Sequence, residues 1–531
     1  MEAFRQGDYP RATQAALEAL AQDERNGDAW LVLGAARTRT GDLDTAMTAY
    51  EAALALAPER IEIANDLGQI AHRLHRTDEA AHYFALYHAA RPGDLGAVAN
   101  LANVLRERHQ FDEAIALLRP AIQADPQSAA LWNALGAVLD ARCDPAAAAT
   151  FFQEALRLDP RHASARSNLA IARLSAGDAE GALQVCNGAL ADAGSPGDLA
   201  RTRMIRSTTL FVLGRIGEAW DDYEARLDPA YPDATRFLID RPRWDLKTDL
   251  RGRSILLFGE QGLGDQFRFA GTVPDLLQAL GPDGRLTIAV EERLIPLFRR
   301  TYAEAEVIGL HKTVENGRGV RFLPGFDATK IDLWTPMASP MGRFRRNLAD
   351  YPPRAPKLLA DPRRVAHWRG RVQALAGLKV GLLWKSLTVD GARSKFFSPF
   401  DRWAPIVRTA GVSFVNLQYG DSTEELRHAR EAWGVDIWTP PEVDLRNDLD
   451  EVAAIACALD LVVGPENSAT SMICACAAPT WIVAVRDHWH CQGTDGYPWY
   501  PSARAFNQAT FGDWDEPIGR LAAALAEAVG G

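Results

Sequence analysis

Residues 27–60 read "GDAWLVLGAARTRTGDLDTAMTAYEAALALAPER" and contain two apolar stretches on either side of a polar turn. The apolar residues recur at helical spacing, so the stretch predicts two amphipathic helices joined at "GDLD", with Pro58 ending the second. The small residues Gly34 and Ala46 allow the two helices to approach closely. Because one such pair cannot bury its own apolar face, the stretch predicts a fold of stacked helix pairs.

The pattern repeats with a period of 34 residues through the first part of the chain. The repeated positions are Ala12, Ala46, Ala80, Ala114, Ala148 and Ala182, together with Pro58, Pro92, Pro126 and Pro160. Units begin at residues 27, 61, 95, 129 and 163, preceded by a half unit and followed by a divergent one. The array is therefore expected to cover residues 1–228.

The positions of Trp30, Leu33, Gly34, Ala46, Tyr50, Ala53 and Pro58 resemble the tetratricopeptide pattern. This resemblance implies an α-superhelix with an extended concave surface. The functional interpretation is a surface that binds a protein or peptide. The alternative is a spacer or a self-association element.

Composition limits the remaining function classes. The chain has 531 residues, 47% hydrophobic and 24% charged, as in an ordinary globular protein. Its net charge of -11 argues against sequence-independent binding of nucleic acid, which needs clustered Lys and Arg. The first residues lack a signal-peptide pattern and no run of about 18 apolar residues occurs. We therefore expect a cytoplasmic protein without membrane insertion.

The cysteines and histidines do not predict a metal site. Six cysteines without a CxxC pair argue against a disulfide framework or a structural zinc site. The densest cluster, "RDHWHC", contains His488, His490 and Cys491, but alternate residues of a strand share a face whether or not a metal binds. No separate carboxylate stands out as a further ligand, so we predict no metal and no cofactor.

After a linker expected at 229–248, short β-branched runs alternate with amphipathic stretches. The runs are "SILLF", "RLTIAV", "AEVIGL", "LKVGLLW", "VSFVNLQ", "VDIW", "LDLVVG" and "PTWIVAV". Strands separated by helices predict parallel sheets. The expected fold class is thus an α-superhelical array followed by an α/β region of two Rossmann-like lobes, residues 249–372 and 373–531, with a cleft between them.

Ligands of open α/β sheets bind beyond the carboxyl ends of the strands, so the residues there are the candidate site. In the first lobe they form the turn "GEQGLGD", with Gln261, Gly262, Gly264 and Asp265. In the second lobe they are Lys385, Gln418, Tyr419, Asn467, Ser468, Thr470 and Ser471.

The polar series from Asn467 to Ser471 opens an apolar run that predicts a helix. Such residues cap a helix, and the N–H groups of a helix start also bind phosphate. Lys385 can add a positive charge beside a phosphate, and Tyr419 or Trp384 can stack on a base. We interpret this place as a nucleotide-sugar site.

The ordered motifs resemble those of bacterial tetratricopeptide-repeat glycosyltransferases. They are "GEQGLGDQFRFA", "KVGLLWKS", "ARSKFFSPFDRWAPIV", "VSFVNLQYGD", "LDLVVGPENSATSMICACAAPTWIV", "PWYPSARAF" and "GDW". The catalytic region is similar to heptosyltransferases and, more distantly, to the O-linked N-acetylglucosamine transferase. The resemblance implies a GT-B fold, a donor held by the second lobe and an acceptor by the first. It also implies metal-independent, inverting transfer with Asp265 as the base.

One motif departs from these families, which commonly read Asp-Thr-Ser-x-x-His where this chain reads residues 466–471, "ENSATS". Ser471 stands in place of the histidine. A subset of the array-bearing enzymes glycosylates flagellin from a cytidine-monophosphate donor, and an altered helix entry is compatible with that subset. The alternatives are a saccharide or lipid-linked acceptor, or a scaffold whose glycosyltransferase domain has lost activity.

Overall fold

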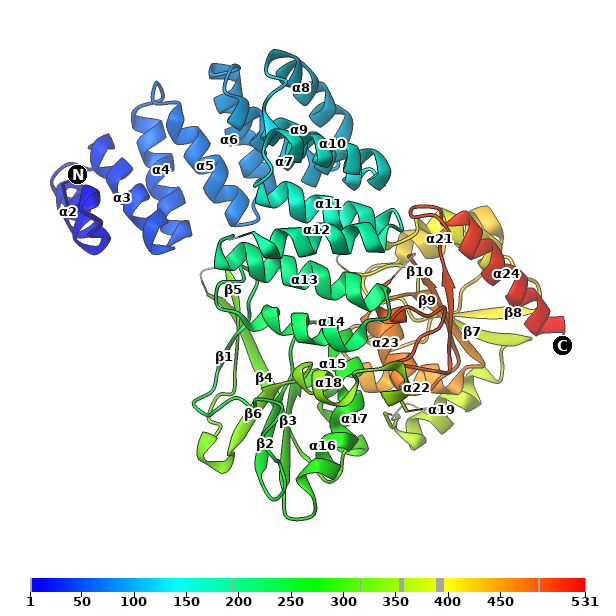
Figure 1. Ribbon diagram of the computed structural model, residues 1–531. Coiled ribbons are helices and arrows are strands. Elements are labelled where there is room, and N and C mark those ends of the chain that lie inside the picture. Colours follow the sequence, from blue (N-terminus) through cyan, green and yellow to red (C-terminus); the bar gives the residue numbers. More distant parts are fainter. Residues whose placement is uncertain are drawn as a thin grey trace. The chain divides into compact units, whose positions relative to one another are not determined.

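The computed structural model describes residues 2–192, 194–315, 317–352, 358–387, 396–485 and 488–530. It contains stacked tetratricopeptide helices followed by two mostly parallel α/β sheets (Figure 1). The chain divides into two compact units, Met1–Ala172 with Val314–Gly319 and Arg173–Thr313 with Val320–Gly531. Part of the quoted motif "ARSKFFSPFDRWAPIV", residues 392–395, lies outside the described residues.

The first unit is built from antiparallel helix pairs, and the predicted units match them. After α1 (Glu2–Arg5) and α2 (Tyr9–Gln22), the helices are α3 (Gly27–Thr40), α4 (Leu43–Leu56), α5 (Glu62–Arg73), α6 (Thr77–Ala90), α7 (Leu95–Glu107), α8 (Phe111–Ala124), α9 (Ala129–Ala141), α10 (Pro145–Leu158) and α11 (Ala163–Ser175). The first helix of each pair begins within one residue of the predicted start.

Close approach within a pair depends on a glycine facing an aromatic ring. A Cβ added at Gly34 would lie 2.9 Å from the Tyr50 ring, and one added at Gly68 would lie 2.6 Å from the Phe84 ring. Each ring is 16 residues after its glycine, which is the same place in each repeat. The predicted role of the small residue at Gly34 is confirmed.

The last helices pack with the α/β region in the second unit. They are α12 (Ala179–Ala191), α13 (Pro196–Val212) and α14 (Ile216–Tyr223), followed by a 3-10 turn, η1 (Glu224–Leu227). Trp220 of α14 is 2% exposed, and its ring centroid lies 6.1 Å from that of Phe269 and 6.2 Å from that of Trp499. These helices therefore belong to the same hydrophobic core as the two sheets.

The first sheet has six strands in the order β1-β5-β4-β3-β2-β6. They are β1 (Arg236–Leu238), β2 (Ser254–Phe258), β3 (Arg285–Glu291), β4 (Glu306–Glu315), β5 (Arg318–Phe322) and β6 (Leu333–Pro336). The edge strand β1 lies within the segment 229–248 that was expected as a linker, and it pairs with β5. Since β2 pairs in parallel with both β3 and β6, the strand order reverses at β2.

The second sheet has five strands in the order β11-β10-β9-β7-β8, and all neighbours pair in parallel. They are β7 (Leu378–Leu382), β8 (Val412–Asn416), β9 (Leu461–Pro465), β10 (Thr480–Ala484) and β11 (Ala503–Asn507). The run "VDIW" was expected as a strand, but it contributes only an isolated bridge from Trp438 to Val415. The order reverses at β7, which lies between β8 and β9.

The helices of the lobes connect these strands. In the first lobe they are α15 (Leu263–Phe269), α16 (Val273–Leu280), α17 (Ile295–Thr301) and α18 (Ser339–Phe344). Those of the second are α19 (Pro362–Val372), α20 (Ala404–Val407), α21 (Thr423–Trp433), α22 (Leu449–Ala458), α23 (Ser468–Ala475) and α24 (Asp515–Gly530). Among the described residues, no helix has both the length and the apolar character needed to cross a membrane.

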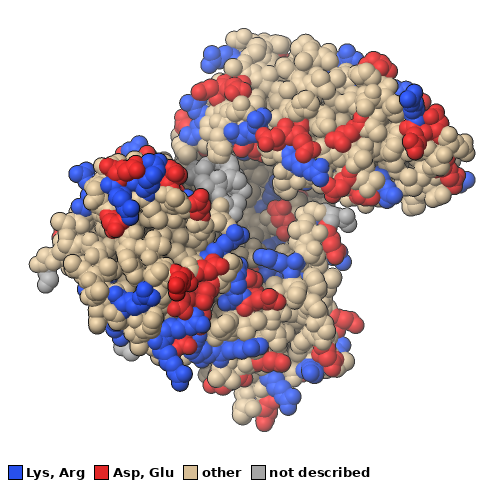
Figure 2. Space-filling model, turned by 180° about the vertical axis from the view of Figure 1, so that it is seen from behind, with Lys and Arg blue, Asp and Glu red and all other residues tan. Residues whose placement is uncertain are grey.

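Charged side chains of both signs intermingle on the face that Figure 2 shows.

Candidate functional site

A helix from each lobe begins at or beside the point where the strand order of its sheet reverses, and these two helices meet. Helix α15 follows β2, where the order of the first sheet reverses, through the turn "GEQGLGD". Helix α23 follows β9, the neighbour of β7, where the order of the second sheet reverses. A Cβ added at Gly264 would lie 3.2 Å from Ser468 Cα and 3.4 Å from Ser471 Oγ. Glycine at 264 thus permits direct packing of the predicted acceptor loop on the predicted donor helix. Crevices at such reversals are where α/β sheets bind ligands.

A pocket of about 250 Å³, here called the interlobe pocket, lies beside this contact. Both lobes contribute, and the lining includes two aromatic rings, two arginines, two serines and several aliphatic side chains. The lining residues are Leu263, Phe267, Arg293, Ser386, Leu387, Tyr419, Leu445, Arg446, Leu449, Val452, Ser468, Ala469 and Met472. Two of the predicted site residues, Tyr419 and Ser468, are among them.

The polar series at the start of α23 divides into residues bonded within the chain and one that lines the pocket. Asn467 Oδ1 accepts the N–H of Thr470 at 2.9 Å, which is an N-cap bond. Thr470 donates its hydroxyl to Pro465 O, and Ser471 donates to Asn467 O. These bonds explain why Asn467, Thr470 and Ser471 are polar without invoking a ligand. Ser468 lines the interlobe pocket.

Lys385 and Gln418 are also held by contacts within the second lobe. Gln418 is 1% exposed, and its Oε1 accepts the N–H groups of Trp384 and Lys385 at 2.9 and 3.0 Å. Its amide therefore joins the ends of two strands. The Lys385 ammonium forms an ion pair with Glu425 of α21.

Asp265 caps α15, since its Oδ2 accepts the N–H of Gly262 at 3.1 Å. Its Oδ1 accepts a bond from Arg268 Nη1 at 3.0 Å, and the side chain remains 26% exposed. Burial raises the pKa of the Asp265 carboxyl above its ordinary value, although Arg268 and the Gly262 N–H partly oppose this. A raised pKa makes the carboxylate a stronger proton acceptor.

The turn before Asp265 is held by two arginines that sequence reasoning missed. Glu260 accepts two bonds from Arg226, at 2.8 and 2.9 Å, and both side chains are 2% exposed. Arg321 donates to the carbonyls of Gly259 and Gln261. Gln261 has a φ of 56°, which is strained for a residue with a Cβ, so the fixed carbonyls hold a conformation that the turn would otherwise avoid.

Arg268 connects the first lobe to the second. Its Nη2 donates to Glu466 Oε1 at 2.5 Å and to Ser471 Oγ at 2.9 Å, while its Nη1 donates to Asp265. Ser471 occupies the position of the motif histidine, so in this chain a guanidinium from α15 contacts that position. In the sequence, the three-residue spacing of Asp265 and Arg268 on one helix face could have indicated that these two side chains interact.

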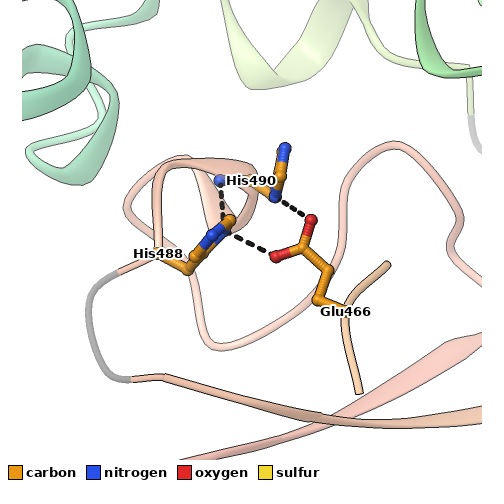
Figure 3. Close-up of side chains that lie close together, drawn as sticks. All are labelled: Glu466, His488 and His490. Atoms are coloured by element: carbon orange, nitrogen blue, oxygen red, sulfur yellow. Dashed lines mark hydrogen bonds and ion pairs between the residues drawn. The ribbon is translucent and has the colours of Figure 1, made fainter. Parts of the chain in front are cut away.

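Two histidines converge on Glu466 (Figure 3). His488 Nδ1 lies 2.9 Å from Glu466 Oε2, and His490 Nδ1 contacts Oε1. Burial alone opposes ionisation of Glu466, but His488, His490 and Arg268 hold the pKa of its carboxyl well below the ordinary value. Sequence reasoning singled out both histidines and missed Glu466, which is 22 residues earlier but follows the adjacent strand β9.

Comparisons with known proteins agree with the helical array. One model of the tetratricopeptide repeat family matches residues 1–61, 39–94 and 100–160, and another matches residues 141–201. Solved structures similar to parts of the chain include a tetratricopeptide repeat protein of Parabacteroides merdae. It has 15% identity and a TM-score of 0.39, and the match covers 42% of this chain and 87% of that one.

A relative is similar over nearly the whole length. Protein FlbA of Caulobacter vibrioides is 44% identical over 530 residues, which are 99% of this chain and 89% of FlbA. The BBSome complex member bbs-4 of Caenorhabditis elegans is 28% identical over 146 residues, or 27% of this chain and 32% of that protein. The similarity to FlbA therefore includes both lobes, whereas that to bbs-4 is local.

Proposed function

We propose that this chain, which belongs to the FlbA family, transfers a sugar from a nucleotide-activated donor to a protein acceptor. The observation that carries the proposal is the interlobe pocket, which lies beside the contact between α15 and α23 and is lined by both lobes. Two parallel α/β lobes with their strand reversals meeting at one pocket are compatible with a GT-B-like arrangement.

The donor binds in the interlobe pocket. Ser468 and Ala469 begin α23 and line the pocket, so their backbone N–H groups and the helix dipole can bind phosphate. Arg446 supplies a positive charge and Tyr419 an aromatic face for the base. This role falls on backbone and pocket-lining groups, while Asn467, Thr470 and Ser471 hold the helix start in place.

The acceptor approaches from the first lobe. Asp265 takes the proton from the acceptor hydroxyl while the hydroxyl oxygen forms a bond to the anomeric carbon of the donor sugar. The bond from that carbon to the donor phosphate breaks. The phosphate leaves with the electron pair and is stabilised by the start of α23. Asp265 is suited to this role by its raised pKa and residual exposure.

The tetratricopeptide array recruits the acceptor. Such arrays present extended surfaces that bind proteins, and the array here is joined to the α/β region through the shared core of α12–α14. The acceptor we propose is flagellin, as the resemblance to the array-bearing enzymes implies.

A truncation separates recruitment from chemistry. Because α12–α14 are part of the core of the second unit, the array is best removed at residue 172 rather than at 228. We expect residues 173–531 to retain donor hydrolysis but to lose modification of the protein acceptor. Undiminished modification by the truncated chain would contradict a recruiting role for the array. Loss of donor hydrolysis together with loss of folded circular dichroism would indicate a damaged second unit instead.

A non-catalytic scaffold is the second candidate. It is favoured by the internal bonding of Asn467, Thr470 and Ser471, and by the position of Asp265, which is not among the lining residues of the interlobe pocket. Calorimetric titration with a panel of nucleotide sugars discriminates the two. Saturable binding of one of them supports the transferase, and heat changes no larger than dilution for all of them support the scaffold.

A further inference from the structure

Glu466, His488 and His490 each direct one ligand-type atom toward a common point. These atoms, a carboxylate oxygen and two imidazole nitrogens, all lie within 4.8 Å of one another. Glu466 follows β9, and the histidines follow β10, so the cluster stands at the carboxyl ends of two paired parallel strands. Figure 3 shows the three side chains pointing toward one another.

Hydrogen bonds within the chain leave one nitrogen of the His490 ring without a partner. His490 is 5% exposed, and its Nδ1 contacts Glu466 Oε1. Its Nε2 makes no hydrogen bond within the part of the chain that the structure describes. A buried polar atom without a partner is costly, so a ligand that engages this ring would relieve that cost.

The contacts of His488 lead to the same conclusion. Its Nδ1 lies 3.4 Å from the backbone N–H of His490, for which it acts as an acceptor, and 2.9 Å from Glu466 Oε2. In the tautomer with its proton on Nε2, the single Nδ1 lone pair faces the carboxylate oxygen. A cation that binds both atoms replaces the long contact with the His490 N–H and turns that repulsion into attraction.

We propose that Glu466, His488 and His490 bind one divalent first-row transition-metal ion, with Zn²⁺ as the best match. Two imidazoles and one carboxylate are ligands that Zn²⁺ takes in proteins, and they disfavour Mg²⁺ and Ca²⁺, which prefer oxygen. This differs from the sequence prediction of no metal, because the carboxylate that appeared to be missing is Glu466. The inference does not rest on the proposed transfer reaction.

The charges around the cluster permit a cation. Arg268 binds Glu466 Oε1, so the ion takes Oε2, on the side of His488. The two carboxylates of Asp265 and Glu466 pair with the single guanidinium of Arg268, which leaves a net charge of about -1. A divalent ion therefore enters a region that is net negative before it binds.

An entry path and a further coordination position are also present. His488 lines a second pocket of about 370 Å³, whose other residues include Asp495, Asn507 and Gln508. Three protein ligands leave one position of a tetrahedral ion open, as in zinc sites that hold a water molecule. The second pocket gives the ion and that water a route from solvent.

The test is a metal titration of the full-length protein after chelator treatment. Zn²⁺ is titrated against a chromophoric chelator, and Co²⁺ is added separately to detect the visible absorption of a low-symmetry site. We expect one equivalent of tight binding, weakened by roughly 100-fold or more in His488→Ala, since one of three ligands is lost. Fe²⁺ and Ni²⁺ titrations identify which first-row ion is preferred.

The matched control is His428→Ala, which removes a half-buried histidine that pairs with Asp401 on the same lobe. It should bind as the wild type does. His488 is 20% exposed, so its truncation is better tolerated than that of His490, and circular dichroism verifies folding. Absence of stoichiometric uptake by the wild type, or uptake that His428→Ala loses and His488→Ala retains, would overturn the proposal.

Discussion

Arg226 and Glu260 form a doubly hydrogen-bonded ion pair, with Nε to Oε2 at 2.8 Å and Nη2 to Oε1 at 2.9 Å, and both side chains are 2% exposed. Arg226 lies directly after the last helix of the array, and Glu260 lies in the glycine turn of the first lobe. Glu260 Oε1 also accepts the N–H of Ala338 after β6. The pair therefore joins the end of the array to the turn that positions Asp265.

Replacing Arg226 should destabilise the second unit strongly. Arg226→Met leaves Glu260 buried without its cation, which costs about 3–5 kcal/mol of unfolding free energy. The control is Arg215→Met, which removes an exposed pair with Glu218 and should cost about 1 kcal/mol or less. Urea unfolding measures both variants. Equal losses would contradict a structural role for the buried pair.

The contact between α15 and α23 should not tolerate a methyl group. Gly264→Ala places a Cβ 3.2 Å from the backbone of Ser468, so the two helices must move apart by a few tenths of an ångström. We expect weaker donor binding by calorimetry and an overpacking cost of about 1–3 kcal/mol.

Gly271→Ala is the matched control for this change, because a Cβ there has no neighbour within 4 Å. It should bind donor like the wild type. If Gly264→Ala also binds donor like the wild type, the close approach of the two helices is not needed to form the site.

Arg446 should contribute to donor affinity. Arg446→Ala removes a positive charge from the interlobe pocket, and we expect a loss of about 10-fold in the donor Kd, which corresponds to roughly 1.4 kcal/mol. Arg427→Ala serves as the control, because Arg427 pairs with Glu424 and Glu431 on the exposed face of α21. Calorimetry in low and high salt measures the donor Kd of both variants. An equal loss of donor affinity in the two variants would indicate a general charge effect rather than a contact by Arg446.

The dependence of activity on pH should report the Asp265 carboxyl. Burial raises its pKa, and the base must be ionised, so kcat/KM should fall as pH decreases through a value above that of an ordinary aspartate. Removing the opposing guanidinium in Arg268→Met should shift this limb to still higher pH. An acidic limb that stays in place in that variant would exclude Asp265 as the titrating group.

The regular parts of the fold could be predicted because local patterns determine them. The repeat at Gly34 and Tyr50 requires only the two helices of one pair. The strands β2, "SILLF", and β9, Leu461–Pro465, are buried on both faces. The prediction of a strand at "VDIW" was wrong. Its short apolar pattern resembles that of a strand, but only Trp438 pairs with the sheet.

The site could be predicted only in part, because its charges meet through tertiary contacts. Tyr419 and Ser468 were predicted because they follow strands, and both line the interlobe pocket. The Arg226–Glu260 pair joins residues 34 positions apart, and Arg268 reaches Glu466 across 198 positions. No local spacing in the sequence marks such partners.

Intact-mass analysis of cellular proteins tests the central claim, protein glycosylation by this chain, most directly. Proteins are compared from cells that carry the wild type, no copy, or Asp265→Asn, whose side-chain oxygen can still accept the Gly262 N–H but is not a base. We predict that one protein, flagellin in our proposal, loses the mass of a sugar in both the deletion and the Asp265→Asn cells. An unchanged mass for every protein in the deletion cells would contradict the account.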